Sequence, residues 1–356
     1  QLLRGLMPHV RCGLVAAASP QQPDSHLGCP YPVWVSTNLG KWDAVTLSPT
    51  VLVHAWRLLW TGQVSLLHVH LPNPWADLIV QGAPARVPVV ASWHSDIVRQ
   101  KGWLKLYRPL QRATLRRASR IIVATTAHWR SSTQLKGHDI EAKIAVVPYG
   151  VDLAALTLAH ADPAMMERIQ AFAAGRPVIA TVGRHIYYKG YPWLLEALAS
   201  MQTNAVLVMV GQGPLTPQLQ QQALWLGVGQ RVLWLGGQPR ASMIAALQAC
   251  DVFTLPSVEP SEAFGLASAE AMACGKPTVV CALGNGVEEL NRHGHTSLVV
   301  PPRDPAALAR ALDTLLQNHA LRRRMGDQAR QWVATRYSVD SMVAATLDVY
   351  RDLIGP

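Results

Sequence analysis

The chain has 356 residues, roughly two to three times the length of a common single domain, so its length predicts two domains with separate cores. Hydrophobic residues make up 49% of it and charged residues only 15%, which excludes an intrinsically disordered chain. No uncharged apolar run reaches the roughly 18 residues of a membrane-spanning helix, and five scattered cysteines without a C-x-x-C pair argue against a disulfide framework or a zinc ribbon and favour a reducing cytosol.

The excess positive charge lies almost wholly in the first half of the chain. Residues 1–152 hold 16 Lys+Arg and 7 Asp+Glu, which gives +9 of the total of +10, and the remainder holds 16 and 15, which gives +1. A basic half indicates an anionic partner, either nucleic acid, a phospholipid surface or a phosphorylated substrate. Because no nucleic-acid recognition motif is present, we expect no nucleic-acid partner.

Short β-rich runs alternate with helical stretches in the first half, which is the pattern of a parallel sheet wrapped by helices. The predicted strands are 12–18, 32–36, 66–70, 87–93, 120–125 and 144–148. Residues 1–6 are typical of the end of a helix. We therefore predict a Rossmann-like domain over 1–152, with an element missing before its first residue.

The segment 99–120 holds eight basic residues and no acidic one. If it is helical, a cationic row and a partly apolar row lie on different faces. These rows are Lys105, Arg108, Arg112 and Arg116, and Trp103, Tyr107, Leu110 and Thr114. Either this helix lies on an anionic membrane surface, or the apolar row packs on the N-terminal sheet and the cations face water. Pro109 predicts a kink or a restart rather than one unbroken helix.

The second half repeats the alternation more regularly. Its predicted strands are 177–183, 205–211, 231–236, 251–257 and 277–281, and its predicted helices are 193–199, 215–226, 241–249 and 266–273. Each strand is a continuous apolar run, as expected for strands buried on both faces. We predict a doubly wound domain over 153–337 that ends in helices, and a last helix, 338–356, that packs back on the N-terminal domain.

Glycines and cations cluster where predicted strands lead into helices, the edge at which open α/β sheets bind ligands. Gly183 ends one strand and is followed by Arg184 and Lys189, two cations that can neutralise a diphosphate. Gly211 and Gly213 end the next strand. Each feature alone is also compatible with a purely structural loop.

Two carboxylates follow a later strand. Glu262 precedes a helix that starts near 264–265, and Glu270 lies eight residues further on, about two helical turns away and hence on the same face. A structural alternative makes Glu262 a partner of the helix dipole and Glu270 a solvated residue. The apolar neighbours of Glu270 favour ligand binding.

Taken together, these residues resemble a known family. Four motifs occur in its order: VPYGVD at 147–152, G-R-x4-K at Gly183, Arg184 and Lys189, G-x-G-P at 211–214, and E-x7-E at Glu262 and Glu270. The chain resembles, over essentially its whole length, the retaining, metal-independent glycosyltransferases of the GT-B fold, specifically the family-4 group. The resemblance implies two Rossmann-like doubly wound domains that face a cleft, with the acceptor bound by 1–152 and a nucleotide-sugar donor by 153–337.

The resemblance also implies roles for single residues of the second half. Arg184 and Lys189 would bind the donor diphosphate, and Glu262 would hold hydroxyls of the donor sugar. Glu270 would accept hydrogen bonds from the ribose. The remaining donor-binding candidates are Gly183, Gly211, Gly213, Phe264, Gly265 and Leu266.

In the first half, ASWHSD at 91–96 is similar to the family's strand-end histidine motif. This similarity would place His94 beside the donor sugar and the acceptor. Asp96 would either orient the acceptor or cap the following segment, and Arg99 and Lys101 are further candidate contacts of the acceptor.

Transfer of this kind places negative charge on a departing phosphate, so Arg184, Lys189 and helix-end amides would act electrostatically on the leaving group. The sequence has no D-x-D motif, and we therefore expect no metal and no bound cofactor. The resemblance favours same-face attack with retention, because no carboxylate nucleophile is identifiable.

The segments HSDIVRQK at 94–101 and RHIYYKG at 184–190 are similar to segments of bacterial enzymes that build O-antigen, capsule or exopolysaccharide chains. The similarity implies transfer of mannose or a related sugar from a GDP- or UDP-sugar to a lipid-linked or saccharide acceptor. It also implies a cytoplasmic protein on the inner face of the cytoplasmic membrane, attached through 99–120.

Two alternatives stay open. One is a nucleotide-sugar-binding protein without transferase activity, because the family's first strand and glycine-rich loop are not found in this sequence. The other is an epimerase or a phosphorylase of similar fold.

Overall fold

The computed structural model describes residues 1–18, 28–42, 45–97, 101–137 and 139–355. The chain forms two compact units, of which unit 1 is Gln1–Gly150 with Val339–Pro356, and unit 2 is Val151–Ser338. The boundaries predicted from the sequence, after residues 152 and 337, lie beside these divisions. Each unit has its own hydrophobic core.

Unit 2 is built on a parallel sheet with the strand order β11-β10-β9-β12-β13-β14. Its strands are β9 (Val178–Val182), β10 (Val206–Val210), β11 (Val232–Gly236), β12 (Val252–Leu255), β13 (Thr278–Cys281) and β14 (Ser297–Val300). This is the strand order of dinucleotide-binding folds, and the order reverses between β9 and β12. The predicted doubly wound domain is confirmed, and the switch point between β9 and β12 is where such sheets bind ligands.

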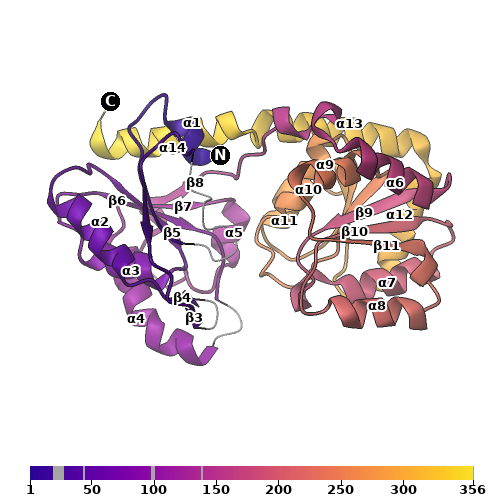
Figure 1. The fold of residues 1–356 in the computed structure, drawn as a ribbon, viewed down its shortest axis with the longest axis horizontal. Helices are drawn as coiled ribbons and strands as arrows, with labels where there is room; N and C mark the ends of the chain where they lie inside the picture. Colours follow the sequence, from indigo (N-terminus) through magenta and orange to yellow (C-terminus); the bar gives the residue numbers. More distant parts are fainter. Residues whose placement is uncertain (19–27, 43–44, 98–100, 138, 356) are drawn as a thin grey trace. The chain divides into compact units, whose positions relative to one another are not determined.

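Helices cover both faces of this sheet, with α7 and α8 on one side and α9 and α10 on the other (Figure 1). The helices of unit 2 are α6 (Pro163–Ala173), α7 (Tyr191–Ser200), α8 (Thr216–Trp225), α9 (Arg240–Ala249), α10 (Leu266–Ala273), α11 (Gly286–Leu290), α12 (Pro305–Gln317) and α13 (His319–Arg336). Strand β10 reads V-L-V-M-V and is buried at every position, as two-sided coverage requires.

Helix α6 lies in a stretch where the sequence analysis predicts no element. Its signal is nevertheless present: Asp162 accepts hydrogen bonds from the amides of Ala164 and Met165, at 3.1 and 3.3 Å, and Pro163 occupies the first turn. An Asp N-cap followed by Pro is a helix start.

Unit 1 contains a parallel sheet with the order β5-β6-β7-β8, a parallel pair β1-β2 and an antiparallel pair β3-β4 among its described residues. The strands are β1 (Leu14–Ala17), β2 (Val33–Ser36), β3 (Lys41–Trp42), β4 (Val45–Thr46), β5 (Leu67–Leu71), β6 (Val89–Trp93), β7 (Arg120–Val123) and β8 (Ile144–Val146). The helices are α1 (Leu2–Leu6), α2 (Thr50–Trp60), α3 (Pro74–Gln81), α4 (Lys101–Arg117), α5 (Thr126–Ser131) and α14 (Val339–Ile354). Because β5 and β6 are parallel neighbours, their carboxyl ends lie at one edge.

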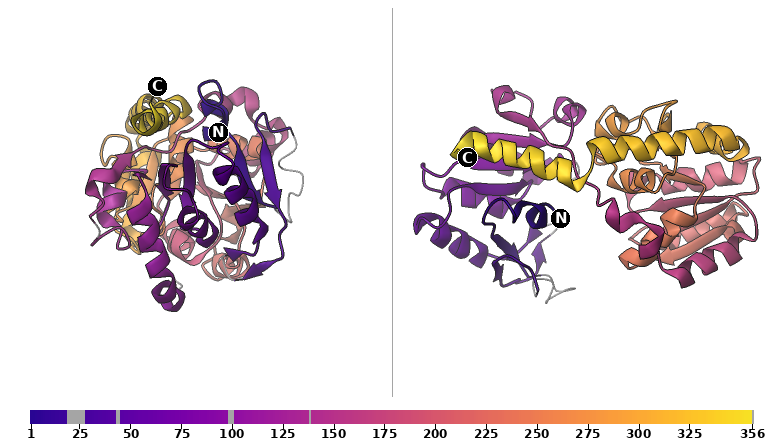
Figure 2. Two further views of the ribbon diagram at one scale, coloured as in Figure 1. Left: turned by 90° about the vertical axis from the view of Figure 1, so that its left-hand side faces the viewer. Right: turned by 90° about the horizontal axis from the view of Figure 1, so that it is seen from above.

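The last helix, α14, belongs to unit 1 and lies beside α1 (Figure 2). Its buried face includes Val343 and Leu347, which share a hydrophobic cluster with Leu6 of α1 and Val90 of β6. Burial of this apolar face is what holds the C-terminal helix on the first unit.

Helix α4 runs through Pro109 as one helix, so the expected restart is wrong. Pro109 is exposed, so solvent can satisfy the carbonyl that a proline in this position leaves without its amide partner. The row predicted to be apolar faces α3, not the sheet: the Tyr107 hydroxyl donates to Asp77, and the Gln81 amide donates to Thr114 Oγ1 at 3.2 Å. Arg108, Arg112 and Arg116 are exposed.

Within the described residues, no helix is both long enough and apolar enough to cross a membrane.

Candidate functional site

The donor-site candidates of unit 2 come together at the carboxyl ends of three neighbouring strands. Gly183 to Lys189 follow β9, Gly211 to Gly213 follow β10, and Glu262 to Leu266 follow β12. These strands adjoin in the order β10-β9-β12, so their loops share one edge on the two sides of the switch point. Open sheets bind nucleotides at this edge.

Lys189 and Glu262 form an ion pair across the switch point. Lys189 ends a short 3₁₀ turn (Tyr187–Lys189), and its Nζ lies 2.5 Å from Glu262 Oε2. Both side chains are only 12% exposed. The Ser257 hydroxyl also donates to Glu262 Oε2, at 3.0 Å, and Asn285 Nδ2 donates to the Glu262 carbonyl at 2.8 Å. The sequence predicts both charged residues but neither of the two groups that hold Glu262 in place.

Arg184, by contrast, is exposed, and its side chain makes no hydrogen bond or ion pair with another described residue. Its guanidinium therefore keeps all its donors for a ligand. An exposed Arg and a largely buried Lys on one strand-end loop suit a diphosphate, because the Arg binds phosphate oxygens as a fork and the Lys acts as a point charge.

Glu270 is the second predicted carboxylate, and its side chain is 15% exposed. Its Oε1 accepts from Arg240 Nη1 at 3.0 Å. Burial raises the pKa of Glu270, and Arg240 opposes that rise. A structural alternative in which Glu270 is fully solvated does not describe this site. Arg240, in the first turn of α9, is a site residue that no sequence motif identified.

The glycines of the site are explained by close packing of the strand-end loops. A Cβ at Gly211 would lie 2.1 Å from the Gly183 carbonyl oxygen, and one at Gly213 would lie 2.4 Å from the His185 carbonyl oxygen. Gly183 itself has a φ of +158°. These positions require glycine whether or not a nucleotide binds, and the donor-binding role of their backbone stays a prediction.

Helix α10 begins at the same edge. Gly265 is its N-cap residue with a φ of +84°, in the left-handed region, and its carbonyl accepts from the amides of Ser268 and Ala269. The amides of Leu266 and Ala267 precede the first intrahelical bonds and have no acceptor among the described residues. With the positive end of the helix dipole, they can receive an anionic or hydroxyl oxygen.

In unit 1, His94 directly follows β6 at the carboxyl edge of the sheet. Its Nε2 lies 2.7 Å from His70 Nδ1, and its Nδ1 lies 2.5 Å from the Tyr149 hydroxyl. Burial lowers the pKa of His94 to about 4, with smaller contributions from His70 and His128. His94 is therefore neutral near pH 7. The sequence analysis predicts His94 but neither of its two partners, although His70 occupies a strand-end position of its own.

The carboxylate of Asp96 is hydrogen-bonded to other residues of unit 1. Its carboxylate accepts from Trp93 Nε1, from the Ser132 hydroxyl, from the Thr133 amide and hydroxyl and from the Gln134 amide, at 2.5–3.3 Å. These bonds fasten residues 132–134, which is neither of the two roles expected for Asp96, and both roles stay predictions. Arg99 lies outside the described residues, and the same holds for the side chain of Lys101.

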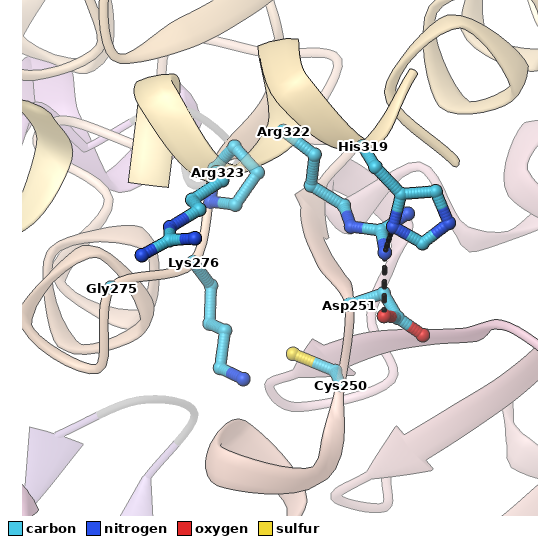
Figure 3. Close-up of a pocket in the computed structure, with 8 residues that line it drawn as sticks. Cys250, Asp251, Gly275, Lys276, His319, Arg322 and Arg323 are labelled. Atoms are coloured by element: carbon cyan, nitrogen blue, oxygen red, sulfur yellow. Dashed lines mark hydrogen bonds and ion pairs between the residues drawn. The ribbon is translucent and has the colours of Figure 1, made fainter. Parts of the chain in front are cut away.

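A pocket of about 430 Å³ lies at the opposite edge of the unit 2 sheet, before β12 and β13 (Figure 3). Two of its charged side chains stabilise the fold. Arg322 donates to Asp251 at 3.3 Å and to the Leu316 carbonyl at 3.0 Å, and Lys276 donates to the Gln248 carbonyl at 2.8 Å. No predicted site residue lies there.

Comparison with known proteins agrees with this arrangement. Residues 165–332 match the family described as Glycosyl transferases group 1, and residues 3–150 match the Glycosyl transferase 4-like domain. The D-rhamnosyltransferase WbpZ of Pseudomonas aeruginosa is 34% identical over 270 residues, which are 75% of this chain and 68% of that protein.

Two further relatives are named mannosyltransferases. The O-antigen chain mannosyltransferase C of Escherichia coli is 28% identical over 291 residues, 81% of this chain and 76% of that protein. The GDP-mannose-dependent alpha-(1-6)-phosphatidylinositol monomannoside mannosyltransferase of Mycobacterium tuberculosis is 29% identical over 316 residues, 85% of this chain and 80% of that protein.

Among solved structures, HepE of Anabaena in complex with UDP and glucose has the same fold, with a TM-score of 0.80 over 99% of this chain and 95% of that chain, at 22% identity. The strand order of unit 2, the two family matches and the relatives lead to one conclusion: the chain belongs to the group 1 glycosyltransferases, has the GT-B fold and is a glycosyltransferase.

Proposed function

We propose that this glycosyltransferase transfers mannose or a closely related hexose from a GDP-sugar to a lipid-linked or saccharide acceptor in the synthesis of a cell-surface polysaccharide, with retention and without a metal ion. The observation that carries the proposal is the Lys189–Glu262 pair at the switch point, with Arg184 beside it. The printed names of the relatives support the mannosyl or rhamnosyl character of the sugar.

The ion pair explains how one site holds two parts of a donor. Without ligand, Lys189 and Glu262 neutralise each other at 2.5 Å, so neither charge is left buried and unpaired. A bound nucleotide sugar offers diphosphate oxygens to Lys189 and sugar hydroxyls to Glu262. Each residue then exchanges its partner for the substrate group of suitable chemistry, and Arg184 adds a second cation at the phosphate.

The same residues account for the chemistry of transfer. When the anomeric C–O bond breaks, negative charge grows on the departing phosphate. Lys189 and the first amides of α10 are fixed donors that stabilise this charge, and Arg184 adds a second cation. In this proposal Glu270, about one turn into α10, accepts from ribose hydroxyls in exchange for Arg240.

Acceptor-dependent release of GDP tests the proposal. We expect the purified protein to convert GDP-mannose and octyl α-D-mannoside into GDP and a disaccharide with an α linkage, and UDP-glucose to be a poorer donor. We expect EDTA to leave the rate unchanged, because two cationic side chains serve the leaving group. A protein that EDTA inactivates and Mg²⁺ or Mn²⁺ restores contradicts the metal-free mechanism, and a β-linked product contradicts retention.

We further propose that the enzyme works on the inner face of the cytoplasmic membrane, bound through α4. The exposed row Arg108, Arg112 and Arg116 supports this, as does Leu106, which is 75% exposed on the same helix. Each cation near an anionic surface contributes about 1 kcal/mol. Three such cations contribute about 3 kcal/mol of binding free energy, which suits reversible binding to the membrane surface.

Cosedimentation with vesicles tests the membrane proposal. We expect binding to vesicles rich in phosphatidylserine that falls with added salt, and a loss of about two orders of magnitude in partitioning when Arg108, Arg112 and Arg116 are changed to Ser together. The matched control changes three exposed arginines of α13 to Ser, namely Arg323, Arg324 and Arg330. Wild-type protein that stays in the supernatant at low salt, or equal losses in both variants, contradicts the role of α4.

A further inference from the structure

Two strand-end histidines and one tyrosine of unit 1 form a hydrogen-bonded row. His70 lies near the end of β5 and His94 follows β6, and the strand register pairs His70 with Ser92. His70 Nδ1 lies 2.7 Å from His94 Nε2, and His94 Nδ1 lies 2.5 Å from the Tyr149 hydroxyl. We call Tyr149, His94 and His70 the imidazole row.

The rings of the row are nearly coplanar. The planes of His70 and His94 differ by 7° with centroids 5.0 Å apart, and those of His94 and Tyr149 differ by 17° with centroids 5.6 Å apart. The N–H bonds and lone pairs of an imidazole lie in the plane of its ring. Edge-to-edge rings in one plane therefore give well-directed hydrogen bonds, which a face-to-face stack does not.

The bonds of the row use both ring nitrogens of His94. A neutral imidazole has one N–H and one lone pair, so His94 donates to one neighbour and accepts from the other. In either direction of the row, both nitrogens of its imidazole are engaged by His70 and Tyr149. The low pKa of His94, about 4, and the raised pKa of Tyr149, about 12, agree with a row in which both groups keep their neutral forms near pH 7.

The free nitrogen of the row is Nε2 of His70. This atom has no hydrogen-bond partner among the described residues, and the His70 side chain is exposed whereas that of His94 is half-buried. If Tyr149 donates into the row, His70 presents an N–H, and if the row runs the other way, His70 presents a lone pair. Both forms suit a hydroxyl group, which donates and accepts.

A second layer holds the His70 ring in place. His68, on the same face of β5, lies 4.9 Å from His70 between ring centroids, at 16°. Its own nitrogens lie 2.6 Å from the Tyr350 hydroxyl and 2.8 Å from Ser92 Oγ. His68 is thus fixed by α14 and β6, and it supports one side of His70.

We propose that His70 contacts substrate, with its Nε2 hydrogen-bonded to a hydroxyl of the acceptor sugar, and that His94 and Tyr149 are positioning residues that hold and orient that imidazole. The inference rests on the proposed function. The acceptor is assigned because the candidates for the nucleotide, the diphosphate and the hydroxyls of the donor sugar at Arg184, Lys189, Glu262 and Glu270 lie in unit 2, whereas the row belongs to unit 1.

Kinetics with two readouts test the proposal. In His70→Ala we expect kcat/KM for octyl α-D-mannoside to fall by about 10²-fold. The KM for GDP-mannose and the slow hydrolysis of GDP-mannose without acceptor stay unchanged. His70→Gln, which retains a donor and an acceptor, recovers part of the loss. The control is His54→Gln, a half-buried histidine of α2 in the same unit. Unchanged transfer in His70→Ala overturns the proposal, and an equal loss of acceptor-free hydrolysis overturns the assignment to the acceptor.

A binding experiment tests the contact between His70 and the acceptor sugar without requiring catalytic turnover. In protein labelled with ¹⁵N in its histidine rings, we expect octyl α-D-mannoside to shift the Nε2 resonance of His70, and His54 to remain unchanged. A His70 resonance that does not move at saturating sugar overturns the contact. A protein that shows this shift but releases no GDP from GDP-mannose contradicts the proposed function and leaves the His70 contact standing.

Discussion

Lys189→Ala is expected to lower kcat/KM for sugar transfer from GDP-mannose by about 10²- to 10³-fold, the loss that follows removal of one fixed donor to a developing anion. The main fall is expected in kcat, because the charge on the departing phosphate is larger in the transition state than in the bound donor. The measurement is steady-state GDP release at saturating acceptor.

Lys189→Ala also leaves Glu262 buried without its cation, and an uncompensated buried charge costs about 3–5 kcal/mol. The double variant Lys189→Ala/Glu262→Gln removes both charges and is expected to regain most of the stability in urea unfolding, but none of the activity. Lys276→Ala is the matched control, since that lysine bonds to a carbonyl at the other edge of the same sheet. Wild-type activity in Lys189→Ala, or recovery of transfer in the double variant, contradicts the leaving-group role.

Glu270→Gln is expected to weaken GDP binding by roughly 10- to 100-fold, because a hydrogen bond to a charged group contributes about 1.5–3 kcal/mol. Glu262→Gln, by contrast, is expected to leave GDP affinity within about threefold while transfer is lost, because GDP has no sugar for Glu262 to hold. Calorimetry with free GDP separates the two roles.

The acid side of the pH profile gives Glu270 a second test. Burial raises the pKa of Glu270, so on acidification this carboxylate takes up its proton earlier than an exposed glutamate does. The neutral acid accepts hydrogen bonds more weakly, and GDP affinity is expected to fall with pH in the wild type. Glu270→Gln is expected to lack that part of the fall. Exposed Glu167→Gln is the control, and equal GDP affinities of the wild type and Glu270→Gln contradict the ribose role.

Much of the fold is readable from the sequence because unit 2 obeys one simple rule. Strands β10, β12 and β13 are buried at every position, so each is a largely apolar run. Runs such as 205–211 then predict both the strand and the edge where ligands bind. Helix α10 begins at Leu266, beside the predicted start, since Gly265 supplies the left-handed residue at its N-cap.

Local patterns were less informative where packing overrides them. Pro109 predicts a break in α4, yet the helix continues, because an exposed proline leaves a carbonyl that water can satisfy. The row with Tyr107 and Thr114 is predicted to meet a sheet or a membrane, and it meets α3 through polar bonds instead. A helical pattern states which face is apolar but not which element covers it.

The sequence by itself determined the family, through the order of four motifs. It also located the charged residues of the strand-end loops, because continuous apolar runs mark where the strands end. Only the tertiary structure decided their partners: Glu262 with Lys189, Glu270 with Arg240, and His94 with His70 and Tyr149. Such pairs join residues 24 to 73 positions apart, and the order of strands in the sheet brings them together. Spacing along one strand or helix carries no information about that order, which is why the row that leaves His70 free could be found only in the folded chain.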